Sequence, residues 1–145
     1  MMTDAIYTEL VMYHNRHGHN KHVLEDATHI ERGHNPNCGD DLTLQMSVKD
    51  GQIQDAAFVG SGCAISTASM SIMVDLVKGQ TVEKAERLTD YYLKMIRGET
   101  LPEGALDELE DAQVFESLKN MPARVKCGTL GWHCLKVILD QVHTE

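Results

Sequence analysis

Residues 42–59, LTLQMSVKDGQIQDAAFV, contain the pattern that decides the fold. Over 42–49 apolar and polar residues alternate strictly, with apolar side chains at Leu42, Leu44, Met46 and Val48. A period of two is typical of a strand with one buried face. Asp50-Gly51 follows, and both residues tolerate the positive φ angles of a tight hairpin turn. Residues 52–59 are therefore predicted to be the return strand, with Ile53, Ala57 and Val59 on one side.

Helices are predicted on both sides of this hairpin. Apolar residues at helical spacing predict them at 4–16 (through Ile6, Leu10, Tyr13 and His17), from Cys63 to Lys78, from Thr81 to Met95, near 105–119, and from Pro122 through Leu139. Residues 17–40 are polar and rich in His, and we expect an irregular segment there with a short strand near 28–30. This order predicts a single α+β domain over 1–145, a small antiparallel sheet packed on one side by helices.

Composition narrows the class of protein. The formal net charge of −9 argues against nonspecific nucleic-acid binding, which requires positive charge. No apolar run reaches the length of about 18 residues that a membrane helix needs. Residues 1–10 lack the basic start of a secretory signal, so we expect a cytoplasmic protein without a membrane partner. Thiols stay reduced there, so the cysteines are interpreted first as metal ligands or nucleophiles.

Three of the four cysteines lie in contexts that favour thiolate. Cys38, Cys63 and Cys127 are separated by 24 and 63 residues, and we expect each in a loop or at the end of an element. Cys63 follows a Gly-rich turn where a helix starts, and free N–H groups there stabilise a thiolate. Cys127 follows Arg124 and Lys126, whose positive charges act in the same way. The alternative is that these are incidental buried cysteines, which are common.

An acidic side chain accompanies the first cysteine. Gly39 lets the backbone bend so that the Cys38 sulfur and the Asp40 carboxylate converge, whereas Asp41 is expected to point to the other face of the strand. Three sulfurs and one oxygen suit tetrahedral Zn²⁺, and iron also occupies such sites.

Three motifs together resemble the IscU/SufU family of iron–sulfur cluster assembly proteins. They are Asn35-Pro36-x-Cys38-Gly39-Asp40, then Gly60-Ser61-Gly62-Cys63-Ala64-Ile65-Ser66, then Arg124-x-Lys126-Cys127 with Trp132 after it. The likeness covers nearly the whole chain and implies a SufE/IscU-like fold. The sequence is more similar to the SufU branch, because Lys126 stands where IscU proteins have His. SufU proteins also carry an insertion between the second and third cysteines, which we place near 98–120.

The resemblance implies a site and partners. It implies a Zn²⁺ site made by Cys38, Asp40, Cys63 and Cys127, and a pyridoxal-phosphate cysteine desulfurase, SufS, as the sulfur donor. By this analogy a desulfurase His replaces Cys38 on the zinc, and the freed Cys38 accepts persulfide sulfur that passes toward SufBCD. Cys127 is the alternative acceptor, with Arg124 and Lys126 as electrostatic support.

Two other functions stay open. The first is a scaffold for a transient [2Fe–2S] cluster on the same residues, with iron in place of zinc. The second is a non-catalytic module, either a zinc-stabilised adaptor or a His-rich metal buffer. Six histidines lie between residues 14 and 34, and the simpler interpretation is a solvated loop. Cys134 is expected to be a small buried hydrophobe.

Overall fold

A three-stranded antiparallel sheet forms one layer of the protein. The structure, a computed structural model, describes residues 2–37 and 39–145, with side chains described from Glu9 onward in the first helix. The strands are β1 (His29–Asn35), β2 (Asp40–Lys49) and β3 (Gln52–Ser61), in the spatial order β1-β2-β3. Asp50 and Gly51 have φ values of 53° and 74°, so the predicted hairpin turn is confirmed. β1 is longer than the short strand expected near 28–30.

The sheet buries one face against helices. Leu42, Leu44 and Met46 are fully buried, as their alternation predicts. The predicted face of the return strand was wrong. Ile53 belongs to the core together with Ala56 and Phe58, and not with Ala57 and Val59 as expected. A register shift between Ser47 and Val48 pairs Val48 with Ile53 and Ser47 with Asp55, so β3 has one extra residue at this point. After it, even-numbered residues of β3 face the core in place of odd-numbered ones.

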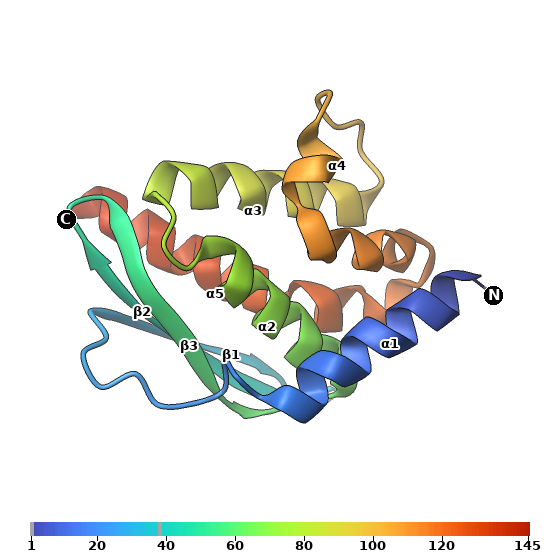
Figure 1. The fold of residues 1–145 in the computed structure, drawn as a ribbon, viewed down its shortest axis with the longest axis horizontal. Coiled ribbons are helices and arrows are strands. Elements are labelled where there is room, and N and C mark those ends of the chain that lie inside the picture. Colours follow the sequence, from blue (N-terminus) through green and yellow to red (C-terminus); the bar gives the residue numbers. More distant parts are fainter. Residues whose placement is uncertain (1, 38) are drawn as a thin grey trace.

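Two helices cover the sheet and separate it from an outer helical layer. Figure 1 shows α2 (Ala64–Val77) and α5 (Pro122–Thr144) between the sheet and the outer elements. The outer elements are α3 (Val82–Arg97), α4 (Ala105–Glu108) and the 3₁₀ helix η1 (Glu110–Asn120), while α1 (Met2–His17) lies against α2. Because α2 is covered on all sides, nearly all its side chains are buried, including four serines and threonines, Ser66, Thr67, Ser69 and Ser71.

Two helical predictions need correction. The single helix expected near 105–119 is instead α4 followed by η1, because Glu110 has a φ of 47° and interrupts the helical path. Among the described side chains of α1, Val11 and His14 are buried and Leu10 packs against the core as expected, whereas Tyr13 is 45% exposed and His17 is exposed. The other predicted helices are present, and the Thr81 side chain caps α3 by accepting from the Lys84 N–H. None of the helices in the described part of the chain is long and apolar enough to cross a bilayer.

Candidate metal centre

Two cysteines and one carboxylate meet at one end of the sheet. Ligand atoms of Asp40, Cys63 and Cys127 all lie within 4.8 Å of one another. Asp40 opens β2, Cys63 precedes α2, and Cys127 lies in α5. Elements that are distant in sequence therefore bring together three of the four predicted metal ligands.

Strand periodicity places the carboxylate. Asp40 shares the helix-facing side of β2 with Leu42, and it is completely buried. Asp41 points to the other face, as predicted, and its carboxylate accepts hydrogen bonds of 2.7 and 2.8 Å from Arg32. The hydrogen bond from this guanidinium lowers the pKa of Asp41. Of the two neighbouring acids, Asp40 is thus the one that faces the cysteines.

The start of α2 positions Cys63. This residue is the N-cap of the helix, with extended backbone (φ −67°, ψ 169°), and its sulfur accepts from the Ser66 N–H at 3.4 Å. Its own backbone N–H donates to Asp40 Oδ1 at 2.9 Å. The positive end of the helix dipole favours a thiolate at this position. The predicted setting of Cys63 at a helix start is confirmed.

Cys127 lies in a different setting from the one expected. It sits in the second turn of α5, not in a loop or at an element end, because the helix already begins at Pro122. Its side chain is 4% exposed. The carbonyl of the next residue, Gly128, accepts hydrogen bonds of 2.7 Å from both the Ser69 and the Tyr92 hydroxyls. These bonds from α2 and α3 fix the turn of α5 that carries the thiol.

The geometry fits a cation. Within the described residues, Asp40 Oδ2 is buried and has no hydrogen-bond partner. A buried carboxylate oxygen without a partner is costly unless a cation or a donor occupies the space beside it. Two thiols and a carboxylate are ligands that a borderline ion such as Zn²⁺ accepts, and three protein ligands leave one coordination position for a further group.

The other predicted site residues are placed as follows. Cys38 lies outside the described residues, two positions before Asp40 in sequence. Arg124 and Lys126 are exposed on the first turns of α5. Cys134 is buried, as expected, and desolvation raises the pKa of its thiol to about 11, with a smaller contribution from Glu31. Such a thiol is a poor nucleophile near neutral pH.

The histidine tract contributes a cluster that the sequence interpretation did not single out. Ligand atoms of His14, His19 and Asp75 lie within 4.8 Å of one another. His34, in contrast, is exposed on β1 opposite Asp41, on the face away from Asp40. The signal for Asp75 in the sequence was a single charged residue within the apolar run of α2, which helical periodicity alone does not connect to two histidines.

Fold and site together define a small α+β protein with a candidate metal site, whose residues come from the start of the central strand, the start of α2 and the second turn of α5. The chain belongs to the NifU-like N-terminal domain family, whose model matches residues 6–93. The resemblance read from the three motifs is therefore confirmed, and the chain is a member of a family of iron–sulfur cluster assembly proteins.

Named relatives align over most of the chain. The chain is 39% identical over 142 residues to the "Iron-sulfur cluster assembly scaffold protein IscU" of Thermotoga maritima, covering 98% of each protein. It is 34% identical over 133 residues to the "Zinc-dependent sulfurtransferase SufU" of Bacillus subtilis, covering 92% of this chain and 88% of that protein. Its fold is similar to the crystal structure of a putative scaffold protein for the SUF system from Fervidobacterium islandicum. That comparison has a TM-score of 0.83 and 33% identity, and covers 93% of this chain and 97% of the other.

Proposed function

We propose that this protein is a zinc-dependent sulfur carrier of the SufU type. Its donor would be a pyridoxal-phosphate cysteine desulfurase of the SufS kind, and the sulfur would pass toward a SufBCD-type assembly complex. The observation that carries the proposal is the convergence of Asp40, Cys63 and Cys127 within 4.8 Å, with Asp40 Oδ2 lacking a hydrogen-bond partner among the described residues. A relative named as a zinc-dependent sulfurtransferase, 34% identical, supports the choice of zinc.

The proposed ligand set is Cys38, Asp40, Cys63 and Cys127. Bound Zn²⁺ would supply a Lewis acid that keeps coordinated thiols deprotonated near neutral pH. The chain contributes the fixed positions of the three described ligands. The Asp40 carboxylate is oriented by the Cys63 N–H, and Cys127 by the hydrogen bonds to Gly128. Arg124 and Lys126 would add positive charge near the anionic ligands.

Sulfur transfer itself needs one thiolate. The Cys38 thiolate attacks the terminal sulfur of the desulfurase persulfide and forms a new S–S bond. The S–S bond of the donor persulfide breaks, and its electron pair leaves on the desulfurase cysteine as a thiolate. No net oxidation or reduction occurs, so no further reagent is required. Cys127 is the alternative acceptor, although it is 4% exposed.

The test measures desulfurase turnover with and without this protein. We expect stimulation by the wild type and none by Cys38→Ala. Cys134→Ala is the matched control, because Cys134 is a buried cysteine that is absent from the described ligand cluster. Full stimulation by Cys38→Ala would refute the assignment of the acceptor and point to Cys127. Desulfurase turnover that never responds to the wild type would favour a non-catalytic zinc-stabilised adaptor or metal buffer.

A scaffold for a transient [2Fe–2S] cluster is the second candidate function. It is favoured by the name of the 39%-identical relative, an iron–sulfur cluster assembly scaffold protein, and it would use the same residues. Anaerobic purification separates the two. Brown protein with iron and acid-labile sulfide would indicate a scaffold, whereas colourless protein with tightly bound zinc would indicate sulfur transfer.

We also propose that residues 98–120 are a SufU-type insertion. The segment follows the part of the chain matched by the family model, which ends at residue 93. It holds a loop, α4 and η1, and buried apolar side chains at Leu109, Phe115 and Leu118 attach it to the core. Replacing 99–119 by a short Gly/Ser linker should lower the thermal stability, because this apolar contact with the core is lost.

A further inference from the structure

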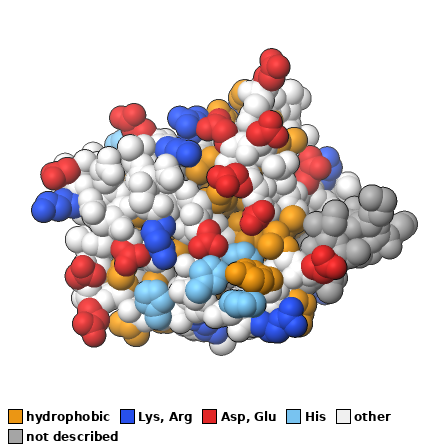
Figure 2. All heavy atoms as spheres, in the orientation of Figure 1, with side chains coloured by type: hydrophobic (Ala, Val, Ile, Leu, Met, Phe, Trp, Pro, Cys, Tyr) orange, Lys and Arg blue, Asp and Glu red, His pale blue; other side chains and the backbone are white. Residues whose placement is uncertain are grey.

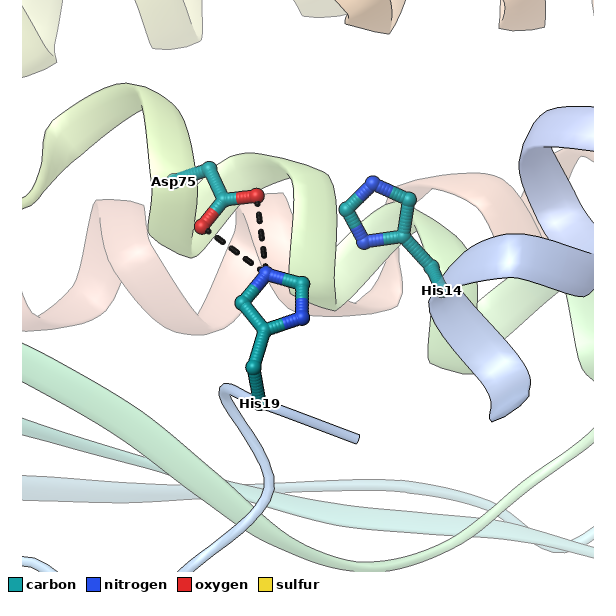
Figure 3. A group of neighbouring side chains, drawn as sticks. All are labelled: His14, His19 and Asp75. Atoms are coloured by element: carbon teal, nitrogen blue, oxygen red, sulfur yellow. Dashed lines mark hydrogen bonds and ion pairs between the residues drawn. The ribbon is translucent and has the colours of Figure 1, made fainter. Parts of the chain in front are cut away.

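A second group of ligand-type side chains lies where the end of α1 meets the last turn of α2, away from the cysteines. His14 belongs to the last turn of α1, His19 follows that helix, and Asp75 belongs to the last turn of α2. Figure 3 shows the two imidazole rings and the carboxylate directed toward one another. Asp75 lies twelve positions after Cys63, the N-cap of α2, which corresponds to about 18 Å along a helix. The two clusters therefore cannot share an ion.

We propose that His14, His19 and Asp75 form a second metal site, which binds a divalent transition-metal ion such as Zn²⁺ or Co²⁺. The ligand atoms of the three residues lie within 4.8 Å of one another. Two imidazoles and one carboxylate are ligands preferred by borderline transition metals, while Mg²⁺ and Ca²⁺ prefer oxygen alone. The site is separate from the one used in the proposed sulfur transfer.

The spacing of the two exposed ligands already suits a shared ion. His19 Nε2 lies 3.2 Å from Asp75 Oδ2 and 3.3 Å from Oδ1. Ligand atoms that are each about 2.1 Å from one tetrahedral ion lie roughly 3.4 Å apart. The His19 and Asp75 side chains are 40% and 47% exposed, so an ion can enter from solvent and both can adjust to it.

Buried neighbours hold the ligands in place. His14 is 3% exposed, and its Nδ1 forms a 2.7 Å hydrogen bond with the Ser71 hydroxyl. Asp75 Oδ1 accepts a 2.9 Å hydrogen bond from the side-chain amide of Asn20, which is itself completely buried. Asn20 also donates to the Ser71 carbonyl at 2.9 Å. Partners of this kind orient metal ligands in known sites, and their loss lowers metal affinity.

The surrounding charge favours a cation. Asp75 lines a small hollow between α2 and η1 together with Glu110 and Asp111. Lys78 is a nearby positive group, but it faces Asp55 at 3.7 Å and donates to the side-chain amide oxygen of Asn20 at 3.4 Å. Figure 2 shows histidine side chains gathered on this face with acidic side chains beside them. The carboxylates of Glu110 and Asp111 near Asp75 therefore add negative charge that attracts a divalent ion to this face.

The competing interpretation is a simple ion pair between His19 and Asp75. Titration of the metal-free full chain with Co²⁺ separates the two interpretations. Co²⁺ bound by thiolates gives an intense near-ultraviolet charge-transfer band, whereas Co²⁺ bound by imidazole and carboxylate does not. We expect calorimetry to detect two binding steps, only one of which develops the thiolate band. We assign the step without the band to binding at the His14–His19–Asp75 site.

Variants locate that second step. His19→Ala and Asp75→Asn change exposed side chains, so folding should be preserved, and each should abolish the step without the thiolate band. Ser71→Ala should weaken it by about 10-fold or more, because His14 loses its orienting partner. His22→Ala is the matched control, an exposed histidine of the same segment outside the cluster, and it should leave both steps intact.

Three results would overturn the proposal. The first is a wild-type titration that ends with the thiolate step. The second is a further step that survives both His19→Ala and Asp75→Asn. The third is equal loss in His22→Ala, which would indicate nonspecific binding by the histidine tract. Zn²⁺ titration followed by imidazole ¹⁵N NMR gives an independent readout, since the His14 and His19 nitrogens should shift before those of His22.

Discussion

The backbone N–H of Cys63 donates a 2.9 Å hydrogen bond to Asp40 Oδ1, and this bond joins the start of α2 to the start of β2. It satisfies one oxygen of a completely buried carboxylate and leaves Oδ2 without a hydrogen-bond partner among the described residues. The same contact thus fixes the orientation of the carboxylate and leaves its second oxygen available to the proposed zinc ion.

Asp40→Asn should separate folding from metal binding. The variant keeps an acceptor for the Cys63 N–H and removes a buried charge, so the metal-free variant should melt at or above the wild-type Tm. With Zn²⁺ present, the gain in stability should fall by at least about 1.4 kcal/mol, equivalent to tenfold weaker binding. Differential scanning fluorimetry with and without Zn²⁺ measures both effects. Asp41→Asn is the control, and an equal loss of the zinc effect in that variant would contradict the role of Asp40.

Gly60→Ala should destabilise the protein strongly. Gly60 has a φ of 115°, and a Cβ there would lie 2.1 Å from the Asp41 carbonyl oxygen, a backbone atom. We expect a loss of roughly 3 kcal/mol or more in the free energy of unfolding, measured by urea titration. Gly51→Ala is the control, with a φ of 74° and open space around the position. It should cost only about 1 kcal/mol. Equal losses in the two variants would exclude the close approach of β2 and β3 as the cause.

Tyr92→Phe should loosen the turn of α5 that carries Cys127. The Tyr92 hydroxyl donates to the Gly128 carbonyl at 2.7 Å and lies 3.2 Å from the Ser69 hydroxyl, and both contacts are buried. Its removal should lower the free energy of unfolding by about 1–2 kcal/mol. Tyr91→Phe, a change at the half-buried neighbouring position, should have little effect. Faster alkylation of Cys127 in Tyr92→Phe would show that loss of this hydrogen bond makes the thiol more accessible. An unchanged rate would limit the role of Tyr92 to stability.

Cys134 should be the least reactive of the described thiols. Burial raises its pKa to about 11, so the thiol stays protonated in the folded protein at neutral pH. The pKa of Cys134 is higher in the folded protein than in the unfolded chain, so burial of the protonated thiol stabilises the fold. This stabilisation is complete at neutral pH and is lost as the pH rises through the alkaline range. Iodoacetamide labelling of the native protein at pH 8, followed by peptide mass spectrometry, should modify Cys134 only after denaturation. Modification at the rate of Cys63 would contradict the burial of this side chain.

The sequence predicted those elements whose signal is local. The hairpin over 42–59 needs only a period of two and a turn at Asp50-Gly51, and the Thr81 cap needs only one side chain at a helix start. The choice of Asp40 over Asp41 followed from the same period, because neighbouring strand residues face opposite sides.

The errors arise where distant contacts override the local pattern. The predicted buried face of β3 was wrong because β3 has one extra residue opposite β2. Such a bulge is a property of the strand pairing and cannot be recognised from the sequence of one strand. The 105–119 segment splits into α4 and η1 because Leu109, Phe115 and Leu118 all pack into the core, which a regular helix would place around different faces. Cys127 is an error of a different kind: the helix predicted from Pro122 already includes this residue, and Cys127 lies in its second turn and not at an element end.

The sequence by itself determined the family, the hairpin and the residue types of the cysteine site, since each is recognised from short motifs or patterns that are local in the chain. Only the tertiary structure decided that Asp40, Cys63 and Cys127 lie within 4.8 Å, and that His14 and His19 meet Asp75 from another helix. The physical reason is that these distances are set by the packing of α1 on α2, of α2 on α5, and of α2 and α5 on the sheet. Such packing depends on many buried contacts between distant residues, so it cannot be predicted from a local motif.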